Sequence, residues 1–501
     1  MKAAMLAILT GSGVLAGCGV LAGCSVFPDY VRPAIDTPAQ WQAQRKDAGG
    51  ATEFTDWWRQ FDDPVLTRLQ QAAEQDNPTL DQAVASIASA RASLAGAEAG
   101  GMPSLAGSGA FSRSKGGGTS GANSQTATGS GTGFGSGITQ ILSGSLDASW
   151  ELDLFGKFAF GRQAEQARLT AAELTWQNAK ISLAAEVASN YVSYRACELA
   201  AAAYQNAIAS KQDAAHLTGV LARAGFSSPA DAALAEASLH AGESSLIAQR
   251  AECDNTVKAL VALTDLAEAD LREWLAGGRG IPTPAQFQVD SVPADLLTQR
   301  PDLAADERKL AAASADIGNA VAKRYPSVSL TGSIGKRKTE TTGLTLSSNT
   351  WSIGPTVTLP IFDGGELRSK VDSAEAAYAS AWASYRSDIR AAIKEVEQAL
   401  VNLSGAEQRE IAEGRSAEQY RQYFQAAELN WRAGGLSLLS LEDARGQMIA
   451  QQISHITQQQ NRVQYWIALY KALGGGWRAQ DTQLNAGTPL SDGNRRSEEQ
   501  L

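Results

Sequence analysis

The sequence has little of what an enzyme or an ordinary membrane protein requires. No run of about 20 apolar residues occurs, so there is no ordinary transmembrane helix. The three histidines, His216, His240 and His455, stand singly on predicted helices without metal-site spacing. Gly-x-Ser-x-Gly, His-Glu-x-x-His and Cys-x-x-Cys motifs are absent. We therefore expect no catalysis and no metal site.

Positive charge and aromatic residues are also sparse. The formal net charge is −10, and Lys and Arg are scattered rather than grouped into a stripe, which argues against a nucleic-acid partner. Aromatic residues make up only 7% of the chain, whereas alanine is abundant. Alanine favours helices and lets them approach closely.

The N-terminus has the features of a processing signal. Lys2 precedes a short apolar run, and the sequence Leu-Ala-Gly-Cys then occurs twice, ending at Cys18 and at Cys24. Leu-Ala-Gly-Cys looks like the lipobox of bacterial lipoproteins, in which the cysteine is acylated. We predict a signal peptide over 1–23 and lipidation of Cys24, with Cys18 as the alternative; this covalent lipid is the only cofactor-like group expected. A plain signal peptide with incidental cysteines is the other interpretation.

The rest of the chain is duplicated. Asn77-Pro78 recurs as Arg300-Pro301, an offset of 300 − 77 = 223, and Arg223-Ala224-Gly225 recurs as Arg432-Ala433-Gly434, an offset of 209. An ordered series of such pairs indicates duplication rather than chance. The predicted boundaries are an N-terminal segment over 24–76, a first repeat over 77–265, a linker over 266–299, a second repeat over 300–476 and a disordered tail over 477–501.

Each repeat contains two predicted strands. Residues 145–155 alternate apolar with acidic or hydroxylic side chains in a strict period of two. Such alternation fits a barrel with lipid outside and water inside, although a soluble sandwich with one wet face shares it. Gly- and Ser-rich residues 115–140 and the shorter segment 336–349 are predicted loops. The predicted strands are about 104–114, 144–155, 327–338 and 350–361.

Very long helices follow each strand pair. No proline occurs over 157–222 or 366–432, and each segment would span roughly 100 Å as a helix. Apolar residues from Ile389 to Leu403 and from Ile449 to Tyr470 step by three and four, which indicates coiled-coil seams. We predict helical hairpins at about 157–264 and 364–473. An isolated coiled coil or a tall helical bundle shares this periodicity but leaves the strands unexplained.

Two cysteines remain after processing, Cys197 and Cys253. Their midpoint, (197 + 253)/2 = 225, falls at the predicted turn of the first hairpin. Residues equidistant from the turn of an antiparallel hairpin lie at the same height, so we predict a disulfide between the two helices, which an oxidising compartment permits. Two buried free thiols are the alternative.

Taken together, these segments resemble a known family. The Cys24-Ser25 start with Arg32-Pro33 is similar to lipid-anchored outer-membrane efflux proteins. Leu-x-x-Arg-Pro-Asp-Leu at 297–303, Leu-Pro-Ile-Phe-Asp-Gly-Gly at 359–365 and the closing segment 470–477 are similar to the same family. This is the TolC-like family in its NodT-type lipoprotein branch, and the resemblance covers roughly residues 15–480.

The resemblance implies a mainly α fold with a membrane β-barrel: a homotrimer with a twelve-stranded barrel continued by a long periplasmic helical barrel. It implies location in the outer membrane, with a periplasmic adaptor and an inner-membrane pump of the resistance-nodulation-division class as partners. The chain would then be the passive exit duct for drugs or other toxic small molecules. The duct of a type I protein-secretion system and a structural coiled-coil lipoprotein are the alternatives.

The resemblance also suggests site residues. Related ducts have a Leu and an Asp past the second helical turn, which here are Leu439 and Asp443, as a periplasmic gate. They are four residues apart, so they share a helix face. An ordinary solvated residue is the other interpretation of Asp443. Gly446 stands where an Arg is expected, with Arg445 beside it. The turns, with Arg223 and Gly225 in the first and Arg432 and Gly434 in the second, are the suggested adaptor-docking tips, and helix capping alone would also explain their glycines.

Overall fold

A computed structural model describes residues 26–35, 41–43, 57–75, 77–115, 138–284, 300–341 and 344–477. Cys18, Cys24, the predicted signal peptide and residues 478–501 of the predicted tail lie outside these ranges. The chain divides into two compact units. The first contains residues 89–169 and 308–382, and the second contains residues 33–88, 170–307 and 383–501. None of the helices in the described ranges is apolar over enough length to cross a membrane.

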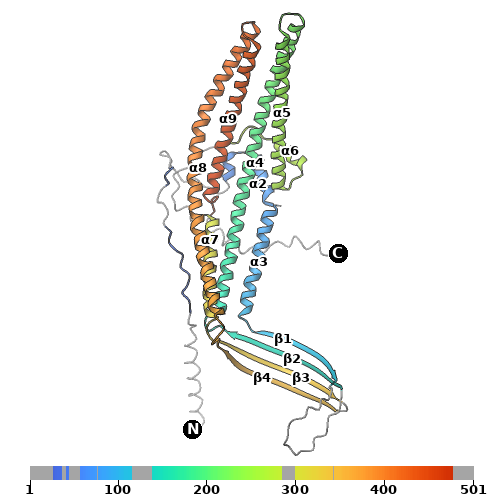
Figure 1. The fold of residues 1–501 in the computed structure, drawn as a ribbon, viewed down its shortest axis with the longest axis vertical. Coiled ribbons are helices and arrows are strands. Elements are labelled where there is room, and N and C mark those ends of the chain that lie inside the picture. The colour runs from blue at the N-terminus through green and yellow to red at the C-terminus, as the bar shows by residue number, and fades with distance from the viewer. Residues whose placement is uncertain are drawn as a thin grey trace, which may run out of the picture. The chain divides into compact units, whose positions relative to one another are not determined.

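The first unit is organised around one antiparallel sheet in the order β1-β2-β3-β4 (Figure 1). Its strands are β1 (Ser104–Lys115), β2 (Ile138–Leu152), β3 (Ser327–Thr341) and β4 (Leu344–Thr358). The backbone pairing continues residue by residue along each of the three ladders. Side-chain parity is therefore preserved across the whole sheet, since a one-residue slip would exchange its two faces.

Apolar side chains occupy one face of this sheet, as the alternation predicts. Leu146, Ile334 and Trp351 are directly opposite one another across three strands, and all three are exposed in the single chain. The other face carries hydroxyl groups that bond across the strands, Ser108 with Ser145 at 2.9 Å and Ser333 with Ser352 at 2.8 Å. One face is therefore suited to lipid and the other to water.

The helix segments of the first unit belong to α3 (Pro78–Gly100), α4 (Lys157–Arg223), α7 (Pro301–Ala322) and α8 (Glu366–Arg432). Buried Phe160 of α4 lies directly against Gly318 of α7, where a Cβ atom would come within 2.7 Å of the ring. Only glycine permits this approach. The Asn319 amide donates to the Lys157 carbonyl at 2.6 Å and holds the start of α4 beside α7.

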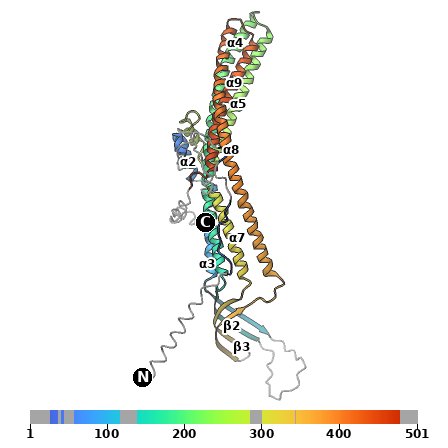
Figure 2. The same ribbon diagram turned by 90° about the vertical axis from the view of Figure 1, so that its left-hand side faces the viewer.

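The second unit contains two long helical hairpins, which run side by side in Figure 1 and overlap in the perpendicular view of Figure 2. The first pairs α4 with α5 (Pro229–Thr264), and the second pairs α8 with α9 (Leu438–Ala472). Val396, Leu403 and Val463, which belong to the predicted coiled-coil seams, are fully buried. Both predicted hairpins are present, within two residues of their predicted starts and within one of their ends.

Shorter elements pack against the hairpins of the second unit. They are the 3-10 helix η2 (Trp57–Phe61), α2 (Pro64–Gln75) and α6 (Glu268–Ala276). Trp57 is fully buried and meets Trp466 and Tyr470 of α9 with ring centroids 5.2 and 4.5 Å away. Part of the segment before the first repeat is thus fastened to the second hairpin by aromatic packing.

The structure corrects four sequence boundaries. The predicted loop over 336–349 is wrong, because β3 extends to Thr341 and β4 begins at Leu344. Its polar residues pair along the backbone, which a sheet with two exposed faces allows. β2 begins at Ile138, which is 144 − 138 = 6 residues early, and β4 ends at Thr358 rather than 361.

The other corrections concern connecting segments. The predicted linker over 266–299 contains α6, which buries Leu271 and Leu275, one helical turn apart. The predicted disordered tail over 477–501 is wrong at its first residue, because Trp477 is buried against Leu174 and Ala305. In both segments a few apolar side chains find a tertiary partner that local composition does not reveal.

Candidate gate and hairpin tips

The two hairpin tips share one backbone design. Gly225 and Gly434 have φ angles of 78° and 79°. The N–H of Phe226 donates to the Leu221 carbonyl at 2.8 Å, and the N–H of Gly435 donates to the Asn430 carbonyl at 2.9 Å. This six-to-one bond with a left-handed residue before it is the Schellman motif. Positive φ therefore explains both predicted turn glycines as helix caps.

The return helices also begin alike. Ser228 caps α5 by accepting from the Asp231 N–H, and Ser437 caps α9 by accepting from the Ser440 N–H, both at 3.1 Å. Each cap satisfies one backbone donor that the first helical turn leaves without an intrahelical partner. The tips therefore have the same fold and differ only in the side chains they present.

Those side chains differ sharply between the tips. The Phe226 side chain, which follows Gly225, is 83% exposed. Its counterpart region in the second tip contains Leu436, which packs against the apolar cluster beneath α9. Arg223 and Arg432 are both exposed, and Arg432 donates to Glu428 at 3.1 Å. Of the turn residues themselves, 224–227 and 433–436, Phe226 is thus the one large apolar side chain that is fully exposed.

The predicted gate residues occupy the exposed face of α9. Leu439 is 66% exposed, and Asp443, one turn later, is exposed and accepts from the Gln447 amide at 3.2 Å. The opposite face of the same turns is buried. It contributes Leu438, Leu441 and Ala444 to an apolar cluster with Ala215, Ala235, Phe424 and Ala427. One face of α9 is therefore anchored while Leu439 and Asp443 project away from the packing.

A group of buried and half-buried polar side chains, here called the tip cluster, joins α9 to the first hairpin. It consists of Lys211 of α4, Ser238 of α5, and Glu442 and Arg445 of α9. Arg445 is 1% exposed; it pairs with Glu442 and donates to Ser210 at 3.0 Å. Lys211 donates to the Ser238 hydroxyl at 2.8 Å and lies 3.6 Å from Glu442. Ser238 in turn donates to Glu442.

The charges of the tip cluster are imperfectly balanced. Burial lowers the pKa of Lys211, attraction to Glu442 raises it, and repulsion from Arg445 lowers it, with a net downward shift. Two cations thus share the carboxylate of Glu442. Removing one partner from such a desolvated group leaves an uncompensated charge, which costs about 3–5 kcal/mol at buried sites. The cluster stabilises this packing only while all its members are present.

Sequence reasoning missed the tip cluster. Ser210 and Arg445 are 445 − 210 = 235 residues apart, and no local pattern connects them. The one available indication was Arg445, a charged residue four positions after Leu441, on the buried side of α9 that also carries Leu438 and Ala444. Gly446, where the resemblance leads us to expect an arginine, is exposed, whereas Arg445 beside it is buried. The polar link on α9 therefore uses the neighbouring, buried position.

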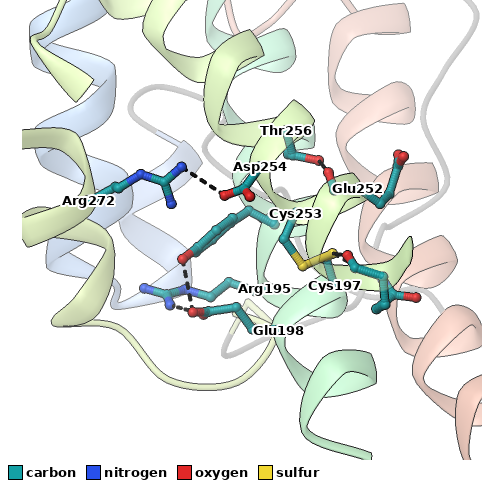
Figure 3. Close-up of a disulfide and its surroundings, with 10 residues drawn as sticks. Arg195, Cys197, Glu198, Glu252, Cys253, Asp254, Thr256 and Arg272 are labelled. Carbon is teal, nitrogen blue, oxygen red and sulfur yellow. Dashed lines mark hydrogen bonds and ion pairs between the residues drawn. A yellow bond between two sulfur atoms is a disulfide. The ribbon is translucent and has the colours of Figure 1, made fainter. Parts of the chain in front are cut away.

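The structure pairs Cys197 of α4 with Cys253 of α5 in a disulfide, with Cα atoms 5.5 Å apart (Figure 3). This is the pairing predicted from their equal distances to the turn. Ion pairs surround it: Arg195 meets Glu198 at 2.7 Å, and Arg272 of α6 meets Asp254 at 2.8 Å (Figure 3). Buried Arg195 also donates to the Leu275 carbonyl at 2.7 Å, so α6 is tied to the same level of the hairpin.

The histidines do not converge. His216 and His240 are exposed, and His240 pairs with Glu243 at 3.0 Å, which raises its pKa. His455 is half-buried and lines a groove of about 660 Å³ between α8 and α9, together with Gly414 and Arg415. Within the described ranges no three His, Cys, Asp or Glu side chains come together as a metal site would require.

Comparison with known proteins places the chain among outer-membrane channels. The model of the outer membrane efflux protein family matches residues 69–265 and 292–475. The chain is 28% identical to nodulation protein T of Rhizobium leguminosarum bv. viciae over 90% of both chains. It is 30% identical to the solvent efflux pump outer membrane protein SrpC of Pseudomonas putida, covering 90% of this chain and 95% of SrpC. The structure of the outer-membrane channel OprN superposes with a TM-score of 0.78 and 28% identity, covering 91% of this chain and 100% of OprN.

Proposed function

The chain belongs to the outer membrane efflux protein family, and from that premise we propose how its parts work together as an exit duct. Its relatives and structural neighbours are outer-membrane efflux channels. The chain is accordingly an outer-membrane channel of the tripartite efflux type, reaching into the periplasm. The observation that carries this function is a sheet with one apolar face in a chain that continues into two long hairpins. In this proposal the duct is passive, and an inner-membrane pump supplies the energy.

The proposed assembly is a homotrimer. Within one chain β1 and β4 are edge strands, and exposed edges are liable to pair with other strands. Four strands are fewer than the eight of the smallest bacterial barrels. Three chains would supply 3 × 4 = 12 strands, with β1 of one subunit beside β4 of the next. Apolar side chains would then face lipid, and the Ser and Thr hydroxyls would line the lumen.

The proposed gate is the exposed face of α9. Three symmetry-related copies of Leu439 and Asp443 would approach the axis at the periplasmic end. Leu439 would narrow the passage, and the carboxylates would repel one another and favour cations. The tip cluster supports this role, because it holds the opposite face of α9 against the first hairpin. Breaking that polar contact is the proposed way in which α9 is released when the duct opens.

The tips are the proposed contact with the partner proteins. A periplasmic adaptor would dock on Arg223 and Gly225 of the first tip and on Arg432 and Gly434 of the second. Exposed Phe226 gives the first turn an apolar contact at a position where the second turn has Gly435. The adaptor would join the duct to a resistance-nodulation-division pump. A lipid on Cys24, or on Cys18 as the alternative, would anchor the N-terminus in the membrane.

Substitution of Asp443 by Ala tests the gate. In planar bilayers Asp443→Ala should raise the conductance of the resting channel and lower its preference for cations, because the carboxylate ring is gone. Asp213→Ala is the matched control: it removes an exposed carboxylate near the tip of the first hairpin and should leave both quantities unchanged. Unaltered conductance and selectivity in Asp443→Ala would rule out Asp443 as a gate residue.

The duct itself needs a separate test. Deletion of the chain should sensitise cells to the exported compounds, and purified protein should conduct ions in a bilayer. Affinity purification from crosslinked cells should recover an adaptor and a pump of the resistance-nodulation-division class. A protein that conducts but copurifies with a type I secretion transporter would support the secretion duct instead.

A further inference from the structure

The outward face of the sheet carries a group of cations that the duct function does not use. Four basic side chains share the apolar face of the sheet, as the strand register shows. They are Arg113 and Lys115 of β1 and Lys336 and Lys338 of β3. All four are exposed, and they are called the basic patch below. Of the charged groups at this end of β3, only Arg337 belongs to the opposite, hydroxyl-rich face.

The basic patch begins where the apolar band ends. On β2 this face has no polar side chain from Leu152 to Leu142, a distance of 152 − 142 = 10 residues, and Gln140 then separates it from Ile138 at the strand's start. Ten residues span about 34 Å along a strand, or about 26 Å of height at the usual tilt near 40°. That matches the apolar band of about 25 Å in outer-membrane barrels. Lys338 is opposite Leu142 and Arg113 is opposite Gln140, so these cations lie at the edge of the band.

This edge is the one farther from the helices. β1 leaves α3 at Ser104 and reaches Lys115 at its other end, and β3 leaves α7 at Ser327 and reaches the lysines near its other end (Figure 1). Since the long helices extend into the periplasm in the proposed function, the basic patch is level with the head groups of the outer leaflet. The inference rests on that orientation.

The charges suit phosphate. Within the described strands, Glu340 is the one acidic residue on the apolar face, and it pairs with Lys338 at 2.5 Å. Four cations against one carboxylate leave a surplus of 4 − 1 = 3 positive charges. Lys336 and Lys338 are about 7 Å apart along the strand, within reach of two phosphates of one head group. Lys336 lies within the band, and its long aliphatic stem would extend to the interface as lysines do near membranes.

We propose that the basic patch binds a phosphate-bearing lipid of the outer leaflet. The head-group phosphates are held by Lys336, Lys338 and Arg113, and the acyl chains lie on the apolar face formed by residues such as Phe111 and Leu142. An arginine at the rim can hold phosphate through two parallel N–H···O bonds, whereas the lysines act as point charges. Such a lipid would fill the surface of the sheet beside β1 and β3 and leave the lumen untouched.

Native mass spectrometry of the full-length protein in detergent tests the proposal. The probes are lipid A with two phosphates and monophosphoryl lipid A, added at equal concentration. Wild type should retain the bisphosphorylated form preferentially. The double variant Lys336→Gln/Lys338→Gln should lose about fivefold in apparent affinity for each lysine removed, and the preference should shrink with it.

Arg337→Gln is the matched control, because it removes one positive charge from the same strand on the other face. It should leave lipid retention unchanged, and Lys336→Arg/Lys338→Arg should preserve retention. Equal retention of both lipids by wild type, or equal loss in Arg337→Gln and the double glutamine variant, would overturn the proposal. Conductance of the double glutamine variant reports separately on the duct, so failure of lipid binding and failure of channel function are distinguishable.

Discussion

In each repeat, the residue just before the first helix donates a hydrogen bond to a carbonyl near the end of the hairpin's second helix. This contact is here called the joint, and the two repeats form it with different chemistry. In the first repeat the Asn77 amide donates to the Leu263 carbonyl at 3.0 Å near the end of α5. In the second, Arg300 donates to the Ala472 carbonyl at 3.0 Å at the end of α9. The acceptors differ by 472 − 263 = 209 positions, the offset of the two tips. Duplication has thus preserved the contact while a neutral amide in one copy corresponds to an ion in the other.

The joint of the second repeat, which uses Arg300, makes more contacts than the joint of the first. Arg300 also contacts Asp302 through two nitrogens, at 3.0 and 2.6 Å, and Glu395 of α8 at 2.9 Å. The first repeat has instead a covalent link higher in its hairpin, between Cys197 and Cys253. The second hairpin has no disulfide within the described residues and is attached to the first through the tip cluster. We interpret the first hairpin as the fixed support and the second as the one held by bonds that can be broken.

The largest expected effect comes from removing the covalent link. Cys197→Ala/Cys253→Ala opens a loop of 56 residues, and chain entropy gives such a disulfide about 4 kcal/mol of stabilisation. Hydrogen exchange should accelerate over 170–264 and much less over 383–472, which serves as the internal control. Equal acceleration in both hairpins would show that the disulfide does not distinguish them.

The next largest effect should be the difference in stability lost when each of the two joints is removed. Arg300→Ala leaves the partly buried Asp302 carboxylate without its partner and should lower the free energy of unfolding by about 3 kcal/mol. Asn77→Ala removes one neutral hydrogen bond and should cost about 1 kcal/mol. Denaturant unfolding of the purified protein at a fixed protein concentration measures both. Equal losses would mean that the charge of Arg300 adds nothing to the joint.

Acid should distinguish the same two joints. Burial opposes ionisation of Asp302, but the bond and attraction to Arg300 outweigh it, so the pKa of Asp302 is lowered from its usual 3.8. A group with a lowered folded-state pKa stabilises the fold above its unfolded-state pKa and loses this contribution as pH falls through the folded value. Below about pH 4, protection against hydrogen exchange, relative to the intrinsic rate at the same pH, should therefore be lost first near 300–303 in wild type, and Asp302→Asn should abolish the difference. Asn77 does not titrate, so the first joint should lack this response.

The smallest effects should be equal in the two repeats. Ser228→Ala and Ser437→Ala each remove one N-cap bond of 3.1 Å, and each should lower stability by about 1 kcal/mol. Thermal unfolding of the two variants in parallel provides the measurement. A clear inequality would indicate that side chains around one tip, such as Phe226 or Leu436, contribute to the cap.

Repetition and periodicity explain most of what was predictable. The offset series located both tips, and the absence of proline together with heptad spacing located helices of 67 residues. The Cys197–Cys253 pairing was predictable from the midpoint of the two positions. Residues at equal distances from the turn of an antiparallel hairpin lie side by side. Strand boundaries were less accurate. Polar residues such as Lys336 and Asn349 resembled a loop, but they pair in the sheet.

The sequence by itself determined the duplicated plan, the alternating sheet and the hairpins, because these depend on local periods of two, three and four residues. Tertiary structure alone decided which side chains from different helices and strands contact one another. Arg445 reaches Ser210, and Trp57 reaches Trp466, only because separate helices pack at one level. It also decided that Arg113 and Lys338 share the apolar face. Register across three strands is a property of backbone pairing, and no single strand contains it.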